Sequence, residues 1–330
     1  MDLRKDYFAD TEIYSLLQTS GVDANQTVED FLHELLSLYD LDQDGETLSK
    51  ALVEDWGIFA DEPSLARVLT ELNAPFATDS RVSYIAQYNA YLQAWEDVKT
   101  EVKTKKRFFC HLDSVVDILD EFDIDSDCLM LFSNDKFFRA RVHKKEEPMF
   151  EQSEMGCPSE PHLASPGRAN PKGISYLYLC CDRETPFYEV RPYYLDRVDI
   201  GEFLIVEDNV KIVDFTEKIN LFNVYCDEGE DAFRKKVKRR VLFDVISSDL
   251  SKPLRSFDSE LEYIPTQYIC EYFKDMGADG IMFESSVRSN GKNLVLFYPE
   301  KATCVNVYPF EVSKITIERR DTYQGHVSLP

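Results

Sequence analysis

Six side chains beyond the first third of the sequence combine cations, an aromatic ring, a carboxylate and a hydroxyl: Arg139, Arg141, Arg168, Tyr178, Glu189 and Ser285. Guanidinium groups bind a pyrophosphate through paired hydrogen bonds. A carboxylate beside a ribose stabilises the oxocarbenium ion that develops as a glycosidic bond breaks. The set therefore suits cleavage of an N-glycosidic bond in a dinucleotide.

One carboxylate suffices for this chemistry when the leaving group is nicotinamide. The ring nitrogen of nicotinamide is already cationic in the dinucleotide, so the base leaves without being protonated. Sugar hydrolases, in contrast, use a pair of carboxyl groups. Glu189 could therefore serve alone. The alternative is that Glu189 is an acid favoured by the dipole at the N-terminus of a helix, and the residues by themselves leave both interpretations open.

The stretch from Gly167 to Glu189 must position three of the six groups. The almost continuous apolar and aromatic run Ile174–Cys181 predicts a buried strand. Thr185 and the proline after it suit the N-cap and the first position of a helix, which places Glu189 in the first turn. Pro192 predicts that this helix is short or kinked.

The arginine pair and the serine are predicted to lie on other strands. Residues 137–142 alternate apolar and basic side chains, so Arg139 and Arg141 should share one face of a strand. Residues 144–166 predict a loop long enough to act as a lid. Ser285 and Ser286 follow the predicted strand 281–284, and Asn290–Gly291 predicts a hairpin turn before an apolar strand.

Residues 1–107 are predicted to form an all-α domain, and residues 108–330 a mixed α+β domain. Apolar side chains recur at helical spacing through the first segment, including a long helix expected over 82–106. The acidic stretch 40–45 matches the start of a calcium-binding loop, but its twelfth position is Ala51 instead of glutamate, so we interpret it as a turn. The six bases within 234–240 predict a solvated helix face, with a phosphate or partner site as the alternative.

Composition excludes several classes of protein. The chain has 330 residues, 44% hydrophobic residues and a net charge of −24, which indicates a folded protein that repels nucleic acid and anionic membranes. Its eight cysteines and five histidines show no metal-ligand spacing. No signal peptide, membrane-spanning run, P-loop or GxSxG motif is present. We expect a reduced, cytoplasmic, soluble protein without a metal.

Several of these segments together resemble the RES domain, named for its Arg, Glu and Ser. The similarity covers roughly residues 108–315 and is carried by Phe138–Arg141, Gly167–Pro171, Leu177–Tyr178, Thr185–Glu189, Gly280–Ser286 and Asn293–Phe297. Residues 27–107 are similar to the helical, HEPN-like domain that precedes a subset of RES domains. The first 107 residues lack both cysteine and the Arg-x4–6-His signature, so we expect neither structural zinc nor nuclease activity there.

The resemblance implies a fold like that of ADP-ribosyltransferase toxins and NAD+ as the substrate. It implies that Glu189 is the catalytic carboxylate, that Arg139 or Arg141 grips NAD+, that Tyr178 lines the nicotinamide pocket and that Ser285 is the serine, with Ser286 as the alternative. Arg168 and Asn170, in the matching loop, are expected to help bind NAD+. Ala169 stands where the family usually has an aromatic residue.

Three functions remain after this comparison. The first is an NAD+-degrading toxin or defence effector that uses water or phosphate as the acceptor, together with an antitoxin or regulatory partner and optional self-association. The second is a protein ADP-ribosyltransferase. The third belongs to another class, a nucleotide-binding regulatory module without turnover. The sequence does not identify the acceptor, the trigger or the oligomeric state.

Overall fold

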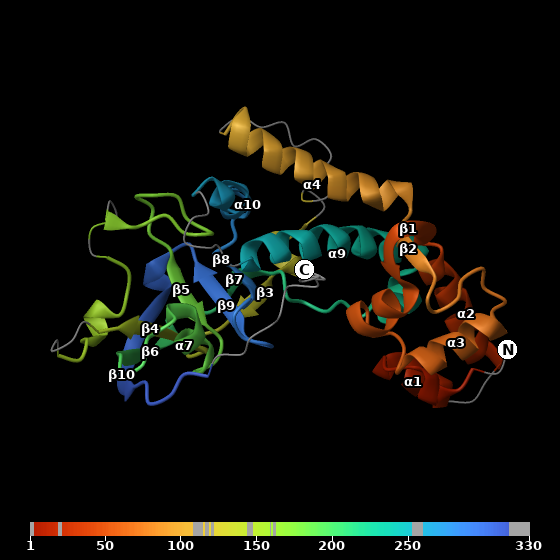
Figure 1. Cartoon of the computed structure of the whole chain (residues 1–330), viewed down its shortest axis with the longest axis horizontal. Helices are drawn as coiled ribbons and strands as arrows, with labels where there is room; N and C mark the ends of the chain where they lie inside the picture. The colour runs from red at the N-terminus through yellow and green to blue at the C-terminus, as the bar shows by residue number, and fades with distance from the viewer. Residues whose placement is uncertain are drawn as a thin grey trace, which may run out of the picture. The chain divides into compact units, whose positions relative to one another are not determined.

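The chain forms two units, and neither is one continuous segment (Figure 1). The computed structural model describes residues 3–18, 22–107, 115, 119, 122–143, 148–158, 160, 163–252 and 260–316. The helical unit comprises residues 1–122 and 217–248, and the sheet unit comprises residues 123–216 and 249–330. The predicted α+β class is correct. The single boundary predicted at residue 107 differs from this division, because residues 217–248 group with the N-terminal segment.

The helical unit is built from amphipathic helices around one apolar cluster. Its α-helices are α1 (Thr11–Gln18), α2 (Val22–Leu36), α3 (Glu62–Glu71), α4 (Ala86–Thr104), α8 (Leu221–Glu228) and α9 (Glu230–Ser251), and a π-helical turn spans Lys50–Asp55. Phe31 lies edge-on to both Phe222 and Phe233, with ring centroids 5.1 and 5.9 Å apart. The later segment therefore completes the core of the first.

The structure adds an antiparallel pair of strands to this mainly helical unit. Strands β1 (Tyr39–Thr47) and β2 (Arg81–Tyr84) pair, and the Tyr39 and Tyr84 rings stack with centroids 5.1 Å apart. The acidic stretch 40–45, predicted as a turn between helices, lies within β1, where the pairing shifts register between Leu41 and Glu46. The helix predicted from residue 82 begins at Ala86, because residues 81–84 are in β2.

The basic residues of α9 have acidic and aromatic neighbours within the helical unit. Arg234 forms ion pairs with Glu34 and Glu230. Arg240 forms an ion pair with Asp244 and lies over the Trp56 ring. These contacts speak against a phosphate site, but the face is less solvated than predicted, since Arg239 is only 9% exposed.

The sheet unit contains eight strands in the order β10-β6-β4-β5-β9-β8-β7-β3. The bounds are β3 (Leu129–Leu131), β4 (Lys136–Val142), β5 (Leu177–Cys180), β6 (Arg197–Ile205), β7 (Val210–Asp214), β8 (Gly280–Glu284), β9 (Lys292–Leu296) and β10 (Ala302–Glu311). All neighbours are antiparallel except β7 and β8. The helices are α6 (Ile124–Asp127), α7 (Thr185–Val190) and α10 (Ile264–Asp275), and short 3-10 turns lie at Gln152–Glu154, Glu260–Tyr263 and Pro299–Lys301.

The centre of this sheet opens between β4 and β5. Strand β4 pairs with β6 along its whole length, but it meets β5 only at Phe138 and Cys180. Because the strands are antiparallel, residues 139–140 of β4 and 178–179 of β5 lie on the side where the two strands separate. Apolar side chains from strands across the sheet, including Phe137, Leu179 and Leu294, form a core on one face. The opening therefore lies beside a rigid, packed layer.

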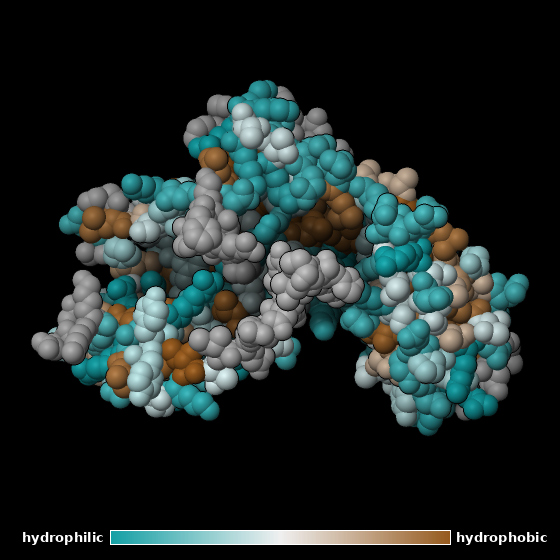
Figure 2. Space-filling view, in the orientation of Figure 1, coloured by the Kyte–Doolittle hydropathy of each residue, from teal (hydrophilic) through white to brown (hydrophobic). Residues whose placement is uncertain are grey.

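The exterior agrees with the charge of the chain. The face seen in Figure 2 is mostly hydrophilic, and the hydrophobic residues on it form separate areas of different size. Within the described ranges, no helix is long and apolar enough to cross a membrane. The seven cysteines in those ranges are free thiols; Cys110 lies outside them.

Candidate active site

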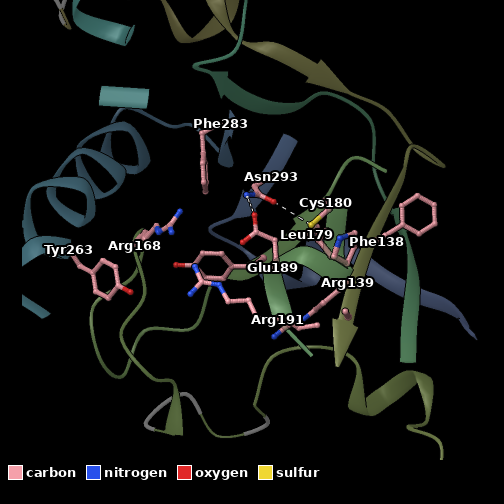
Figure 3. A pocket seen from close by; sticks show the side chains of 14 residues that line it. Phe138, Arg139, Arg168, Leu179, Cys180, Glu189, Arg191, Tyr263, Phe283 and Asn293 are labelled. Carbon is pink, nitrogen blue, oxygen red and sulfur yellow. Dashed lines mark hydrogen bonds between the residues drawn. The ribbon is translucent and has the colours of Figure 1, made fainter. Parts of the chain in front are cut away.

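A pocket of about 530 Å³ lies in the sheet unit beside the opening between β4 and β5 (Figure 3). Four of the predicted site residues line it, and ten further residues complete its wall. The lining residues are Phe138, Arg139, Ala140, Arg168, Tyr178, Leu179, Cys180, Pro186, Glu189, Val190, Arg191, Tyr263, Phe283 and Asn293. Its volume is within the range of roughly 300–1,000 Å³ found for small-molecule sites.

Helix α7 carries Glu189 into this pocket. Phe187 and Val190 pack against the apolar group of Ala140, Val198 and Ile200, so the helix lies on the sheet. The helix is short, as predicted, and Arg191 ends it in the left-handed conformation with φ of 46°. Phe187 and Val190 flank Glu189 in the sequence, and both pack against the sheet. Their packing therefore fixes the distance of the Glu189 backbone from the sheet.

The N-terminus of α7 is capped by Asp182 and not by Thr185. The Oδ1 atom of Asp182 accepts hydrogen bonds from the backbone N–H groups of Glu184 and Thr185 at 2.8 and 2.9 Å. The Thr185 hydroxyl donates to Oδ2 of Asp182 at 2.6 Å. Desolvation opposes ionisation of Asp182, but these hydrogen bonds outweigh it and lower its pKa. The predicted Thr185 cap was wrong because the helix already begins at Thr185, and the hydroxyl of this residue donates to Asp182 instead of accepting from the N–H groups of the first turn.

Two side chains hold the Glu189 carboxylate. The Ser285 hydroxyl donates to Oε1 of Glu189 at 2.8 Å, and Nδ2 of Asn293 donates to the same oxygen at 2.7 Å. Ser285 follows β8 directly, and Asn293 lies on β9. Both donors come from elements about a hundred residues later in the chain. The carboxylate is therefore oriented from outside its own helix.

Asn293 is in turn fixed by Cys180. The thiol of Cys180 on β5 donates to Oδ1 of Asn293 at 3.3 Å, which aims the amide nitrogen at Glu189. Figure 3 shows both hydrogen bonds as a line of three side chains. Asn293 is only 7% exposed, and burial raises the pKa of Cys180. The thiol thus stays protonated and remains a donor.

Tyr178 connects β5 to the loop that contains Arg168. Its hydroxyl accepts from the backbone N–H of Ala169 at 3.0 Å and donates to Oδ1 of Asn170 at 2.7 Å. A Cβ atom on Gly167 would lie 2.5 Å from the Tyr178 hydroxyl, so the loop approaches as closely as glycine permits. Burial raises the pKa of Tyr178.

Replacing Tyr178 by phenylalanine should lower the free energy of unfolding by about 1–3 kcal/mol, because the N–H of Ala169 and the carbonyl oxygen of the Asn170 side chain lose a buried partner. Urea unfolding of the two proteins measures the difference. Tyr188→Phe is the matched control, since that tyrosine is 51% exposed and its hydroxyl should contribute little. A difference below 0.5 kcal/mol at Tyr178 would contradict the role of this hydroxyl in the loop.

The two arginines of β4 have different surroundings. Arg139 lines the pocket, its Nη1 atom is buried without a hydrogen-bond partner in the described part of the chain, and burial lowers its pKa. Arg141 is not a lining residue; its Nη2 atom donates to the carbonyl of Gly156 at 2.6 Å, and its guanidinium lies 5.6 Å from the centre of the Phe150 ring. The Nε atom of Arg141 is likewise buried without a partner among the described residues, so the two arginines differ in that Arg139 lines the pocket and Arg141 does not.

The remaining predicted residues differ in their positions. Arg168 lines the pocket while its Nη1 atom donates to the carbonyls of Leu250 and Ser251 at 2.9 and 3.1 Å. Asn170 does not line the pocket; its amide group donates to the carbonyls of Ser165 and Ile174. Ser286 is exposed and is not a lining residue.

Three arginines and one carboxylate give the pocket wall a positive charge. Arg139, Arg168 and Arg191 face the single acid Glu189, whereas the whole chain has a net charge of −24. In the view of Figure 3, Arg168 and Tyr263 lie on one side of Glu189 and Arg139 lies on the other. Such a wall favours an anionic ligand that extends across the pocket past the Glu189 carboxylate.

Sequence reasoning missed Asn293, Cys180 and Arg191 as parts of the site. Asn293 had two signals: it lies in the segment Asn293–Phe297 that shares in the family resemblance, and an amide within the apolar run 292–297 needs a buried partner. Cys180 resembles any small apolar strand residue in sequence. Nothing in the sequence marks Arg191 as a pocket residue until the last residue of α7 is known.

The pocket contains no residue set arranged for a metal. Across the described ranges, no group of three or more His, Cys, Asp or Glu side chains is placed to hold a metal ion. The wall presents the carboxylate of Glu189, the amide of Asn293 and the guanidinium of Arg139, and Ser285, which is not a lining residue, acts on the pocket through its hydrogen bond to Glu189.

Comparisons with known proteins place this pocket within a named domain. The family model described as the RES domain matches residues 136–315, more than half of the chain, and all fourteen lining residues are within that range. A search of curated proteins finds no match. Among solved structures, the MbcT–MbcA toxin–antitoxin complex of M. tuberculosis is similar, with a TM-score of 0.29 and 11% identity over 57% of this chain and 89% of that chain.

Proposed function

The chain belongs to the RES domain family, and on this premise we propose that its pocket binds NAD+ and cleaves the bond between nicotinamide and ribose. The product would be ADP-ribose or its phosphorylated form, according to whether water or phosphate is the acceptor. A protein that drains NAD+ in this way would inhibit growth, and a partner that restrains it would act as an antitoxin.

The observation that carries this proposal is the fixed carboxylate of Glu189 in a cationic pocket. Ser285 and Asn293 both donate to its Oε1 atom, so the carboxylate keeps one orientation before the substrate arrives. A carboxylate held in advance stabilises a developing positive charge without the cost of reorganisation. The cation in this reaction is the ribosyl oxocarbenium ion.

The arginines supply the counterpart for the pyrophosphate. Arg139 lines the pocket, and a buried guanidinium gains more from an anionic ligand than an exposed one does, because its own hydration is already lost. Arg168 is held at the other side of the pocket by backbone carbonyls. We assign Arg139, rather than Arg141, to the pyrophosphate.

The reaction then proceeds at one carbon atom. The bond from ribose C1′ to the nicotinamide nitrogen breaks, and its electron pair goes to the nicotinamide ring, which becomes neutral. The Glu189 carboxylate stabilises the positive charge left on the ribose. Water or phosphate attacks C1′, and Glu189 can take the proton that an attacking water loses.

The test is incubation of the purified protein with NAD+, with and without phosphate, followed by chromatography of nicotinamide and the ribosyl products. Release of nicotinamide with free ADP-ribose supports hydrolysis, and a phosphate-dependent phosphorylated product supports phosphorolysis. Modified protein in place of either product would favour ADP-ribosyl transfer. No nicotinamide release, even with added partner or acceptor proteins, would contradict the proposal and favour a binding module.

A further inference from the structure

The residues after β8 form a closed turn that carries Ser285. We call residues 285–291 the Ser285 turn. The backbone N–H of Ser285 donates to the carbonyl of Gly291 at 2.7 Å, and the N–H of Gly291 donates to the carbonyl of Arg288 at 3.1 Å. The Ser285 hydroxyl also accepts from the N–H of Val287 at 3.3 Å. The position of Arg288 is therefore tied to that of Ser285 through the backbone.

Arg288 connects the Ser285 turn to the start of α7. Its Nη1 atom donates to Oδ2 of Asp182 at 2.7 Å and to the Thr185 hydroxyl at 2.9 Å. Asp182 is the residue that caps α7, and Thr185 is the first residue of the helix and is fully buried. One nitrogen atom thus contacts both groups that fix the helix N-terminus.

Glycine at position 291 permits this contact. A Cβ atom there would lie 2.7 Å from the Thr185 hydroxyl and 3.2 Å from the Cβ atom of Ser285. The turn and the helix N-terminus therefore approach each other at a distance that no larger residue allows without movement. The close approach is independent of the ion pair and points to the same junction.

We propose that Arg288 is a positioning residue: it fastens the Ser285 turn to the N-terminus of α7 and thereby sets where the Glu189 carboxylate lies relative to Ser285. Arg288 and Asp182 are not lining residues of the pocket, so they act through the two groups they connect. The role rests on the proposed function, because the carboxylate must matter for its placement to matter.

The length of the connection explains the expected effect. Glu189 lies four residues after Thr185, which corresponds to about 6 Å along a helix at 1.5 Å per residue. If the helix rotates about its N-terminus, the Glu189 carboxylate is therefore displaced in proportion to this length. A displacement of 1 Å in a catalytic group can lower a rate by about 10²-fold.

The first test is Arg288→Met, which removes the charge but leaves Asp182 to cap α7. We expect kcat for nicotinamide release to fall by roughly 10- to 100-fold, while KM for NAD+ changes less than about threefold, because no contact with substrate is lost. Arg288→Lys should recover most of kcat, since a single nitrogen makes both contacts and an ammonium group can replace it. Gly291→Ala should lower kcat in the same way as Arg288→Met.

Lys211→Met is the matched control. It removes an ion pair with Asp125, with a separation of 2.6 Å, in the same unit but on β7, and kcat should stay unchanged. Unchanged kcat in Arg288→Met would overturn the proposal. The proposal would also be overturned if Arg288→Met and Arg288→Lys lost kcat to the same extent and lost melting temperature to the same extent. That result would assign Arg288 a stabilising role alone.

Amide hydrogen exchange without NAD+ separates this proposal from the function it rests on. Arg288→Met should raise exchange in both residues 183–190 and the Ser285 turn, and Arg288→Lys should restore protection. If the wild-type protein releases no nicotinamide, the proposed function fails while this coupling of the two segments can still be observed. Exchange that rises in one segment alone would contradict the connection.

Discussion

Replacing Glu189 by glutamine is expected to lower nicotinamide release by about 10³-fold and to leave the fold unchanged. Glutamine keeps an oxygen that can accept the hydrogen bonds from Ser285 and Asn293, now made to Oε1 at 2.8 and 2.7 Å. The substitution therefore removes the negative charge and little else. The oxocarbenium ion would then develop without a counter-charge, in a pocket whose remaining charged side chains are arginines.

The rate is measured as nicotinamide released under saturating NAD+, and circular dichroism with thermal unfolding checks the fold. Glu184→Gln is the matched control, because it removes an exposed carboxylate from the start of the same helix and does not touch the pocket wall. It should retain the wild-type rate. A Glu189→Gln protein with normal turnover would contradict the catalytic role of this carboxylate.

The second large effect separates Arg139 from Arg141. Arg139→Ala should raise KM for NAD+ by roughly 10- to 100-fold, which corresponds to the 1.5–3 kcal/mol of a hydrogen bond to a charged group. Its melting temperature should change little, because a buried guanidinium whose Nη1 atom is unpaired is costly to the folded state. Steady-state kinetics measure KM, and thermal unfolding of the same protein measures the melting temperature.

Arg141→Ala should show the opposite pattern. The carbonyl of Gly156 loses its charged donor and the Phe150 ring loses its cation, so the free energy of unfolding should fall by about 1–3 kcal/mol. KM for NAD+ should change less than in Arg139→Ala. Equal changes in KM for the two variants, or a larger change for Arg141→Ala, would contradict the assignment of pyrophosphate binding to Arg139.

The sequence predicts the local parts of this site well. The strand 174–181, the short helix after Thr185 and the turn at Asn290–Gly291 are each signalled by a few adjacent residues, and each is present in the structure within a few residues. The cap of α7 was predicted wrongly because the helix begins one residue earlier than expected, at Thr185, so Asp182 accepts from the N–H groups of Glu184 and Thr185. The α+β class follows from the same local signals.

The long-range parts of the site have no such signal. Ser285 and Glu189 are separated by 96 residues; their residue types and the family resemblance grouped them in one site, but no local pattern predicts the hydrogen bond between them. Arg139 and Arg141 are equivalent in a strand pattern, since both lie on the same face. Arg139 differs because β4 leaves β5 after Phe138, and strand separation is a property of the assembled sheet.

The division of the helical unit has a consequence for how the protein is made. Phe222 and Phe233 complete the cluster around Phe31, and Arg234 pairs with Glu34, which lies 200 positions earlier. During synthesis at roughly 5–20 residues per second, on the order of ten seconds therefore pass between synthesis of the first 107 residues and synthesis of the segment that completes their core. A fragment ending at residue 107 would expose that cluster, so an exchange of this unit between related proteins requires both of its segments to be transferred together.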